Sequence, residues 1–376
     1  MEQQQKWTLR NFVWIFIACI AEFILIASIW IRRTYGVLCF AMANASFLNF
    51  LKNKRRLFLY YVFIPTICTF FILIIFQIII ERKKHCFSNR KLLYTSLTLL
   101  IVCSLGASMC LDTGTYLSRQ YRLSRTQWYD TDKIIAHALG AIDGVAYTNS
   151  KEALENSYQN GVRYLECDFS ITADHQLVAC HDWDFWYSWE HDTENTDEKY
   201  VPDFEEFMTT KVRTRFTALS GEELMLFMKQ HPDIYIITDT KDSSPATLGE
   251  SFKALVELSQ KNECEDVLDR FIIQIYNLDM YEIVQEIYPF PNYILTLYQL
   301  GFNGEENRME GFAKFCMLHD IDVITMGGYL YSDKLLEIAD RYGLQIFVHT
   351  INDEDEIKAF IDKGVGVYTD KTEFDF

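Results

Sequence analysis

Three short apolar stretches decide the fold: IIAHALG at residues 134–140, YLECDFSIT at 164–172 and QLVACHD at 176–182. Each reads as a β-strand, and each carries chemically active side chains at or near its end. His137, Glu166, Asp168 and His181 therefore fall within one interval of 46 residues. Because the ends of the strands are where side chains meet substrate in a parallel barrel, this clustering predicts a site at one rim of such a barrel.

Apolar runs of strand length alternate with helical patterns from residue 131 to the last residue. The expected strands are 133–138, 162–169, 176–180, 234–240, 271–276, 292–298, 321–326, 344–350 and 364–369. The expected helices are 150–160, 220–230, 247–260, 278–287, 305–318, 332–342 and 353–362, and Ser220 with Glu223 predicts a capping box that opens the second of them. This alternation indicates a parallel sheet, and residues 131–376 match the length of about 250 that is typical of a single (β/α)8 TIM barrel.

One interval, residues 183–216, is too long for a tight loop and is rich in aromatic and acidic residues. It follows His181 and Asp182 directly, so we expect it to overhang the site. The aromatic cluster at 183–189 has two interpretations. It cradles a lipid headgroup or dips into the membrane interface, or it is ordinary loop packing.

Charge divides the chain into two unlike parts. Residues 1–111 contain 13 Lys/Arg and 3 Asp/Glu, whereas residues 112–376 contain 22 Lys/Arg and 49 Asp/Glu. Such asymmetry predicts modules that work in different surroundings. The acidic module would repel a phosphate backbone, so nucleic acid is excluded as a partner.

The basic part is expected to be an all-α transmembrane region of three or four helices. Residues 12–30, 57–80 and 92–111 each approach the ~20 apolar residues that cross a bilayer, and 35–51 is a weaker fourth candidate. The predicted domains are thus a membrane region (1–111), a linker (112–130) and the barrel (131–376), and the expected location is the cell membrane, with the lipid bilayer as a partner. Basic residues flanking the spans divide nine to seven, so the side of the catalytic domain stays open.

The ten cysteines show no paired metal-binding spacing. Cys167, Cys180, Cys264 and Cys316 fall in the barrel region, and two of these lie inside expected strands. We interpret these four as buried free thiols.

The residue types at the strand ends indicate phosphodiester cleavage assisted by a metal. Glu166 and Asp168 stand at i and i+2 of one strand, so they point the same way and can hold a hard divalent cation. His137 and His181 are imidazoles, which can move protons near neutral pH. Lys241 follows another expected strand end beside Asp239, and His349 ends a strand that faces the expected mouth.

In its order of motifs the barrel resembles the glycerophosphodiester phosphodiesterase family, over essentially all of residues 133–373. The family pattern runs H-R-G, E-N-T, E-x-D, H-D, E-x-K, W-T-x-N and G-x-x-x-x-T-D. This chain has HALG at 137–140, TNS at 148–150, ECD at 166–168, HD at 181–182, DTK at 239–241, HTIN at 349–352 and GVGVYTD at 364–370. Each motif is weak alone, and the set of seven in order is specific.

The resemblance implies a role for each matching residue. It implies that Glu166, Asp168 and Asp239 bind Mg2+ or Ca2+, and that His137 and His181 are the catalytic pair. It also implies that Lys241 holds the phosphate and that Asn149 supports the substrate site, to which we add His349 as a candidate substrate contact. The implied reaction hydrolyses a glycerophosphodiester or lipid headgroup to glycerol 3-phosphate and an alcohol, with His181 favoured as the acid of the first step.

Several departures from the family pattern leave the substrate open. Ala138 replaces the arginine of H-R-G, Thr148 replaces the glutamate of E-N-T, Asp239 is a shorter carboxylate, and His349 replaces a tryptophan. The D-x-K version also resembles sphingomyelinase D-type phospholipases, which act on intact lipids or lysolipids. A third alternative is a catalytically inactive barrel that serves as a membrane sensor.

Overall fold

The computed structural model describes residues 127–184, 186, 200–240 and 249–374, all within a compact unit that spans Arg125–Phe376. Among these residues no helix is both long and apolar enough to cross a membrane. The expected spans at 12–30, 35–51, 57–80 and 92–111 lie outside the described residues. The membrane region therefore stays a prediction from the sequence.

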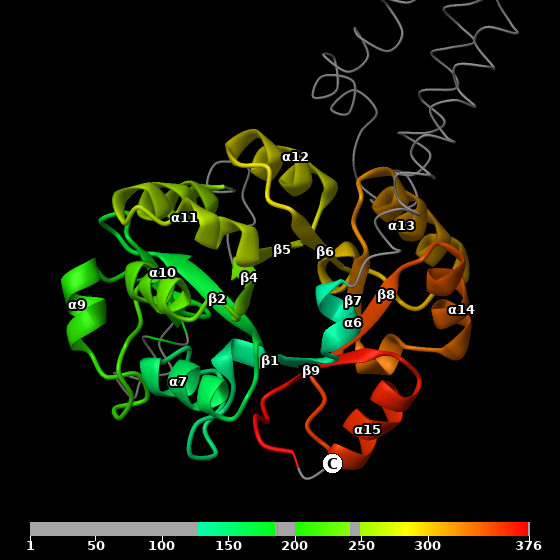
Figure 1. Cartoon of the computed structure of the whole chain (residues 1–376), viewed down its shortest axis with the longest axis horizontal. Coiled ribbons are helices and arrows are strands. Elements are labelled where there is room, and N and C mark those ends of the chain that lie inside the picture. Colours follow the sequence, from blue (N-terminus) through cyan, green and yellow to red (C-terminus); the bar gives the residue numbers. More distant parts are fainter. Residues whose placement is uncertain (1–126, 185, 187–199, 241–248, 375–376) are drawn as a thin grey trace, which may run out of the picture. The chain divides into compact units, whose positions relative to one another are not determined.

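Eight parallel strands close into a barrel with helices around its outside (Figure 1). The sheet runs β1-β9-β8-β7-β6-β5-β4-β2-β3, and a further pairing of β1 with β2 closes the ring. The strands are β1 Ile134–Ala136, β2 Tyr164–Ile171, β3 Leu177–Ala179, β4 Tyr235–Thr240, β5 Phe271–Ile275, β6 Asn292–Thr296, β7 Val323–Gly327, β8 Gln345–His349 and β9 Gly366–Thr369. The predicted TIM barrel is confirmed.

The third predicted strand differs from the rest, because β3 does not join the barrel wall. It pairs antiparallel with the end of β2, with Phe169 opposite Ala179 and Ile171 opposite Leu177. The turn between them is only five residues long, too short for the helical crossover that a parallel pair needs. His181 therefore follows a hairpin at the rim rather than a barrel strand.

The described α-helices are α6 Trp128–Thr131, α7 Lys151–Gln159, α9 Phe204–Thr209, α10 Gly221–Gln230, α11 Glu250–Lys261, α12 Leu278–Ile287, α13 Glu306–Leu318, α14 Asp333–Arg341 and α15 Glu354–Asp362. Seven of them lie close to their predicted positions, whereas α6 and α9 were not predicted. The predicted capping box is confirmed, since the side chain of Ser220 accepts from the Glu223 N–H while that of Glu223 accepts from the Ser220 N–H. This cap fixes where α10 begins after the long interval.

One layer of side chains fills the barrel lumen below the carboxyl ends of the strands; we call this part the lower lumen. Each of the eight barrel strands contributes one residue, namely Ile135, Tyr164, Ile237, Ile272, Ile294, Val323, Phe347 and Tyr368. Trp128 of α6 covers this layer by stacking on Phe347, with the ring centroids 5.6 Å apart. The last residues of the expected linker thus form part of the barrel floor, and residues 1–126 of the expected membrane region and linker lie outside the described residues.

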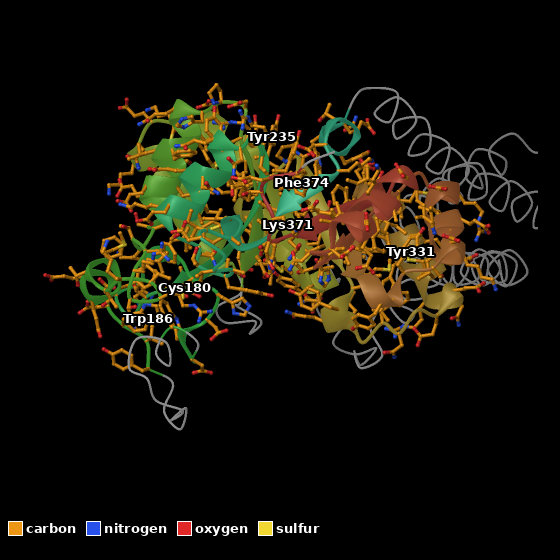
Figure 2. The ribbon with its side chains drawn as sticks, turned by 90° about the horizontal axis from the view of Figure 1, so that it is seen from below. Cys180, Trp186, Tyr235, Tyr331, Lys371 and Phe374 are labelled. Carbon is orange, nitrogen blue, oxygen red and sulfur yellow. The ribbon has the colours of Figure 1, made fainter. Side chains whose placement is uncertain are left out.

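The interval after His181 builds a small core of its own beside the barrel. Trp186 is buried there with Cys180, Phe207 and Phe216, and Trp183 packs against them. Figure 2 shows Cys180 and Trp186 on the side of the molecule where α9 lies. For Trp183 and Trp186 the loop-packing interpretation is therefore confirmed, whereas residues 185 and 187–199 lie outside the described residues.

The cysteine interpretation is confirmed for the barrel. Cys167, Cys180, Cys264 and Cys316 are all free and buried. Burial, and then the charges of Asp168 and Glu166, raise the pKa of the Cys167 thiol well above its ordinary value. Cys167 is therefore an uncharged core residue, and its side chain points to the opposite face of β2 from those of Glu166 and Asp168.

Candidate active site

The site lies one level above the hydrophobic layer of the lower lumen. Because side chains alternate along a strand, the residue two positions beyond each member of that layer also faces the lumen. On β1, β2 and β4 this level brings in His137, Glu166 and Asp239. These three residues, which were predicted from the sequence, thus meet at the carboxyl ends of the strands, as expected for this fold.

Glu166, Asp168 and Asp239 form a compact acidic triad. Asp168 lies directly across from Asp239 in the parallel register of β2 and β4, and Glu166 stands two residues before Asp168 on the same face. One oxygen from each carboxylate can be chosen so that all lie within 4.8 Å of one another. The three residues are 1%, 0% and 7% exposed, so the cluster is shielded from bulk water.

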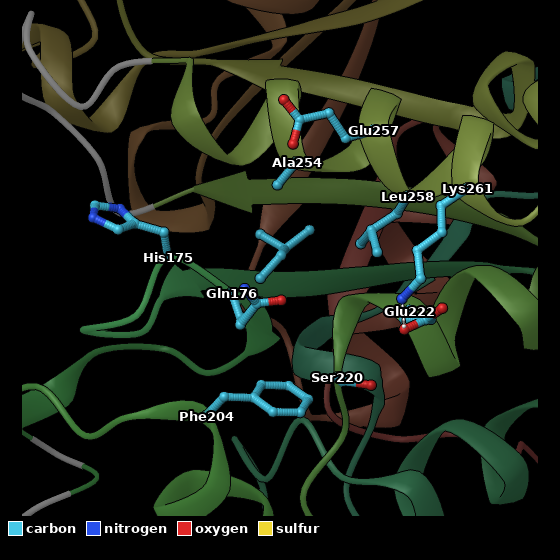
Figure 3. Close-up of a pocket in the computed structure, with 10 residues that line it drawn as sticks. His175, Gln176, Phe204, Ser220, Glu222, Ala254, Glu257, Leu258 and Lys261 are labelled. Atoms are coloured by element: carbon cyan, nitrogen blue, oxygen red, sulfur yellow. Dashed lines mark hydrogen bonds and ion pairs between the residues drawn. The ribbon is translucent and has the colours of Figure 1, made fainter.

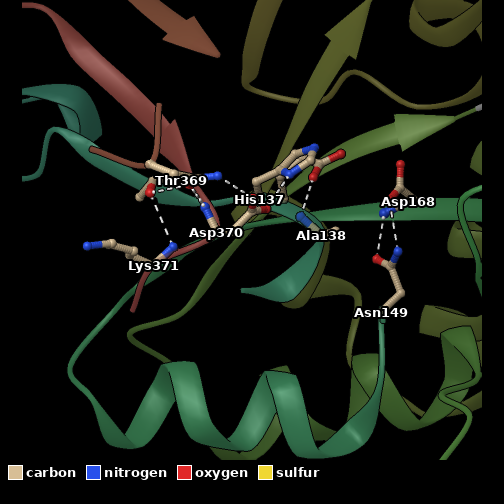
Figure 4. A network of polar contacts seen from close by, with 9 residues as sticks. His137, Ala138, Asn149, Asp168, Thr369, Asp370 and Lys371 are labelled. Atoms are coloured by element: carbon tan, nitrogen blue, oxygen red, sulfur yellow. Dashed lines mark hydrogen bonds and ion pairs between the residues drawn. The ribbon is translucent and has the colours of Figure 1, made fainter. Parts of the chain in front are cut away.

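Each carboxylate of the triad is oriented by a neutral donor (Figure 4 shows the first two). The Ala138 N–H donates to Glu166 Oε2 at 2.6 Å. The Asn149 side chain donates to Asp168 Oδ2 at 2.8 Å and accepts from the Asp168 N–H at 3.1 Å. The Tyr276 hydroxyl donates to Asp239 Oδ1. Burial, and then the charge of Asp239, raise the pKa of Tyr276 well above its usual range, so this donor keeps its proton.

This arrangement fits a divalent cation. Three carboxylates held so close together repel one another in a buried place, and a cation offsets that repulsion. The donor set is all oxygen, which suits Mg2+ or Ca2+ better than a soft metal. The hydrogen-bond donors to each carboxylate fix its orientation, as residues that hydrogen-bond to metal ligands do in other protein metal sites.

His137 is held in place by a carboxylate from the last strand. Its Nδ1 lies 2.8 Å from Asp370 Oδ1, and Asn352 donates to Asp370 Oδ2 at 2.6 Å. Burial raises the pKa of Asp370, but the hydrogen bonds from His137 and Asn352 outweigh it and leave this pKa below its ordinary value. Asp370 therefore stays ionised as the pH falls below the usual carboxyl range, and it holds the His137 ring through Nδ1.

His181 has a matching arrangement and also contacts Tyr147. Its Nδ1 lies 2.5 Å from Asp182 Oδ2, consistent with the orienting role expected of Asp182. The Tyr147 ring contacts both imidazoles edge to face, with its centroid 4.5 Å from that of His137 and 5.7 Å from that of His181. The two histidines therefore both contact one aromatic ring.

The remaining predicted site residues have different outcomes. His349 ends β8 and is mostly buried, and burial with the nearby His137 lowers its pKa to about 4. Asn149 uses both ends of its amide on Asp168, so its role as a substrate contact stays a prediction. Lys241 lies outside the described residues, and its contact with phosphate is likewise a prediction.

Three residues of the site went unnoticed in the sequence. Asp370 stands in the final T-D motif, which could have suggested a partner for a histidine. Tyr276 directly follows β5, at a position whose side chain faces the barrel lumen. The sequence alone does not show which side chains of β5 face the lumen. Tyr147 lies in an irregular segment with φ of 61°, and no pattern in the sequence predicts its contacts with the two histidines.

A separate pocket of about 300 Å³ lies on the outer surface of the barrel (Figure 3). The β2–β3 turn, α10 and α11 line it, with Leu177 and Leu258 among its apolar residues and Lys261 paired to Glu222 at 2.8 Å. None of the site residues predicted from the sequence lines this pocket. It is therefore distinct from the acidic triad.

Comparison of the sequence with protein families gives one match. Residues 141–374 match the model of the glycerophosphoryl diester phosphodiesterase family, which covers more than half of the chain. The match includes all three residues of the acidic triad and begins just after His137 and Ala138. No curated protein matches the sequence significantly.

Solved structures share the barrel at low sequence identity. A candidate glycerophosphodiester phosphodiesterase of Galdieria sulphuraria is 15% identical with a TM-score of 0.53, and the match covers 64% of this chain and 94% of that one. A phosphodiesterase of Oleispira antarctica, in complex with the product sn-glycerol-3-phosphate, is 16% identical with a TM-score of 0.51, covering 63% and 92%. At such identities the likeness shows the fold.

Proposed function

This chain belongs to the glycerophosphoryl diester phosphodiesterase family, and from that premise we propose that it hydrolyses glycerophosphodiesters to glycerol 3-phosphate and an alcohol in a cation-dependent reaction. The observation that carries the proposal is the buried acidic triad beside two histidines that each face a carboxylate. The Oleispira antarctica structure holds sn-glycerol-3-phosphate, which supports the same substrate class here.

The triad of Glu166, Asp168 and Asp239 would hold Mg2+ or Ca2+. When bound, the ion offsets the negative charge on the phosphate oxygens. Ala138, Asn149 and Tyr276 keep the three carboxylates aimed at a common point. We further propose that Lys241, which follows β4 directly, adds a positive charge at the phosphate.

The two histidines would carry the protons. One imidazole takes the proton from the attacking oxygen as that oxygen bonds to phosphorus. The other imidazole protonates the alcohol oxygen as its bond to phosphorus breaks. Where the substrate has a neighbouring hydroxyl, that hydroxyl attacks first, and water opens the resulting cyclic phosphate. We favour His181 as the acid of the first step, and Asp370 and Asp182 orient the two rings.

The proposed activity is tested on the full-length protein purified in detergent. We expect it to release glycerol 3-phosphate from glycerophosphocholine with Mg2+ or Ca2+ present. EDTA should lower release to background, and added ion should restore it. Release that persists in EDTA would contradict the role of the cation. Cleavage of a choline lysolipid alone would favour the phospholipase alternative, and no cleavage of any diester would favour the inactive sensor.

We also propose that residues 1–111 tether the enzyme to the cell membrane through several spans. The support is their length, apolarity and net positive charge. Full-length protein should stay in the membrane pellet after alkaline carbonate washing, whereas a chain without residues 1–111 should not. Full recovery of the intact chain in the carbonate wash would contradict this proposal.

A further inference from the structure

The two histidines of the proposed catalytic pair are carried by different parts of the fold. His137 directly follows β1, a strand of the closed barrel. His181 follows the hairpin of β2 and β3, and β3 is not part of the barrel wall. Closure of the barrel therefore fixes the position of the first imidazole but not that of the second. Proton transfers at one phosphate need both imidazoles in fixed places, so a contact that they share has mechanical value.

Tyr147 supplies such a shared contact. Its ring centroid lies 4.5 Å from that of His137 and 5.7 Å from that of His181, with the ring planes at 90° and 76°. Edge-to-face contacts at these separations are favourable for aromatic rings. Each imidazole is also held at Nδ1 by a carboxylate, from Asp370 and from Asp182 respectively. The carboxylate and the Tyr147 ring together restrict the rotation of each imidazole.

The segment before Tyr147 is anchored to the small core beside the barrel. Ile142 and Val145 exchange two backbone hydrogen bonds, at 3.0 and 2.9 Å, which close a tight turn. Both side chains pack against the core that also contains Cys180, the residue directly before His181. One core therefore supports both the segment that carries Tyr147 and the chain that carries His181.

The segment after Tyr147 is anchored to the acidic triad and to α7. Asn149 binds Asp168 with both ends of its amide, at 2.8 and 3.1 Å. Thr148 Oγ1 lies 3.0 Å from the hydroxyl of Ser150, which is the N-cap of α7. Because Thr148, Asn149 and Ser150 are all buried, the chain is fixed from the first residue after Tyr147.

The backbone of Tyr147 adopts an unfavourable conformation between these anchors. Its φ of 61° lies in the left-handed region, which is sterically poor for a residue with a large side chain. Asn149 also has a positive φ of 46°, but asparagine tolerates this region. Residues held in such conformations persist where the surrounding structure imposes them, and they cluster at functional sites. Here the strained residue is the one whose ring contacts both histidines.

Two other roles for Tyr147 predict different behaviour. A tyrosine that served only to fill a core would be buried, whereas Tyr147 is 37% exposed. A tyrosine that held the substrate would affect KM when it is lost, whereas one that places the catalytic groups would affect kcat. The kinetic constants therefore separate a positioning role from a substrate contact.

We propose that Tyr147 is a positioning residue, whose ring holds the imidazole carried by the hairpin in a fixed place relative to the imidazole carried by the barrel. This inference rests on the proposed phosphodiesterase function and adds a residue that acts through both His137 and His181. The ring of Tyr147, and not its hydroxyl, does this.

Two variants of the full-length protein separate the ring from the hydroxyl. Tyr147→Phe keeps the ring and should keep nearly the wild-type kcat with glycerophosphocholine. Tyr147→Leu removes the ring and should lower kcat about 10- to 100-fold, the scale for a small misplacement of catalytic groups, with KM little changed. A rise in KM alone would make Tyr147 a substrate contact, and an equal loss in both variants would assign the effect to the hydroxyl. Either result overturns the proposal.

Tyr158→Leu is the matched control. It also removes a tyrosine ring from an imidazole, because the ring centroids of Tyr158 and His231 lie 4.4 Å apart. Tyr158 lies on α7 and His231 ends α10, so this pair belongs to the outer helices. We expect no change in kcat. A loss as large as that of Tyr147→Leu would show a general effect of removing a tyrosine and would overturn the proposal.

A chemical footprint tests the shared contact without catalysis. Diethyl pyrocarbonate modifies accessible imidazole nitrogens, and mass spectrometry of the peptides gives the rate at each histidine. Tyr147→Leu should raise the rates at His137 and His181 severalfold, whereas Tyr147→Phe should not, and the rate at His175 should stay constant. If the wild-type protein cleaves no diester, the proposed function fails, while the footprint still reports on the contact. A rise at only one of the two histidines, or at neither, refutes the positioning role.

Discussion

Glu166→Gln is expected to abolish cation-dependent turnover while the barrel stays folded. The substitution keeps the size of the side chain and its hydrogen bond from the Ala138 N–H, but removes one of the three charges that would bind the cation. The loss should be on the order of 10²–10³-fold or more, the scale for losing a preorganised electrostatic contact at a reacting centre. Steady-state hydrolysis of glycerophosphocholine measures it.

A matched control separates this effect from the general loss of a carboxylate. Glu222 lies on α10 and pairs with Lys261 beside the outer pocket. Glu222→Gln should leave turnover unchanged. The unfolding temperature of metal-free Glu166→Gln should not fall, since the substitution weakens the repulsion within the triad. Wild-type turnover in Glu166→Gln would show that the acidic triad is not required for the reaction.

His137→Ala should lower kcat by about 10²–10⁴-fold, the range for losing a general acid or base. KM should change little, because the proposed role of His137 is to move a proton rather than to hold the substrate. Steady-state release of glycerol 3-phosphate over a range of substrate concentrations measures kcat and KM separately. A smaller loss is expected for Asp370→Asn, which keeps the imidazole and weakens its orientation.

His175→Ala serves as the control for this prediction. His175 also pairs through Nδ1 with a carboxylate, Glu250 at 2.6 Å, but it lies at the outer pocket. Its loss should leave kcat unchanged. Equal effects of His137→Ala and His175→Ala, or full activity without His137, would refute the assignment of the catalytic pair.

The parts of the molecule that follow local rules were predictable from the sequence. Alternating strand and helix patterns predicted the barrel, and the capping box at Ser220 marked the start of α10. The shared direction of Glu166 and Asp168 follows from the two-residue period of a strand. Asp239 was predicted as a third metal ligand only from the family resemblance. The register of β2 and β4 places it directly across from Asp168, which explains why the three carboxylates lie together.

Other parts depend on closure of the barrel and left no local signal. Asp370 supports His137 from 233 positions away, because β9 pairs with β1. The antiparallel β3 has the same apolar composition as a barrel strand, so composition could not separate the two. The contact of Tyr147 with His181 depends on the hairpin that carries His181, so no local pattern marks it.

The central claim is that a divalent cation bound by Glu166, Asp168 and Asp239 sets the activity. Titration calorimetry of Mg2+ and Ca2+ into the metal-free, full-length protein, with turnover measured on the same samples, tests it most directly. One ion per chain should bind, turnover should rise in proportion to occupancy, and Glu166→Gln should lose both. Binding that survives Glu166→Gln, or turnover that is independent of occupancy, would contradict the account.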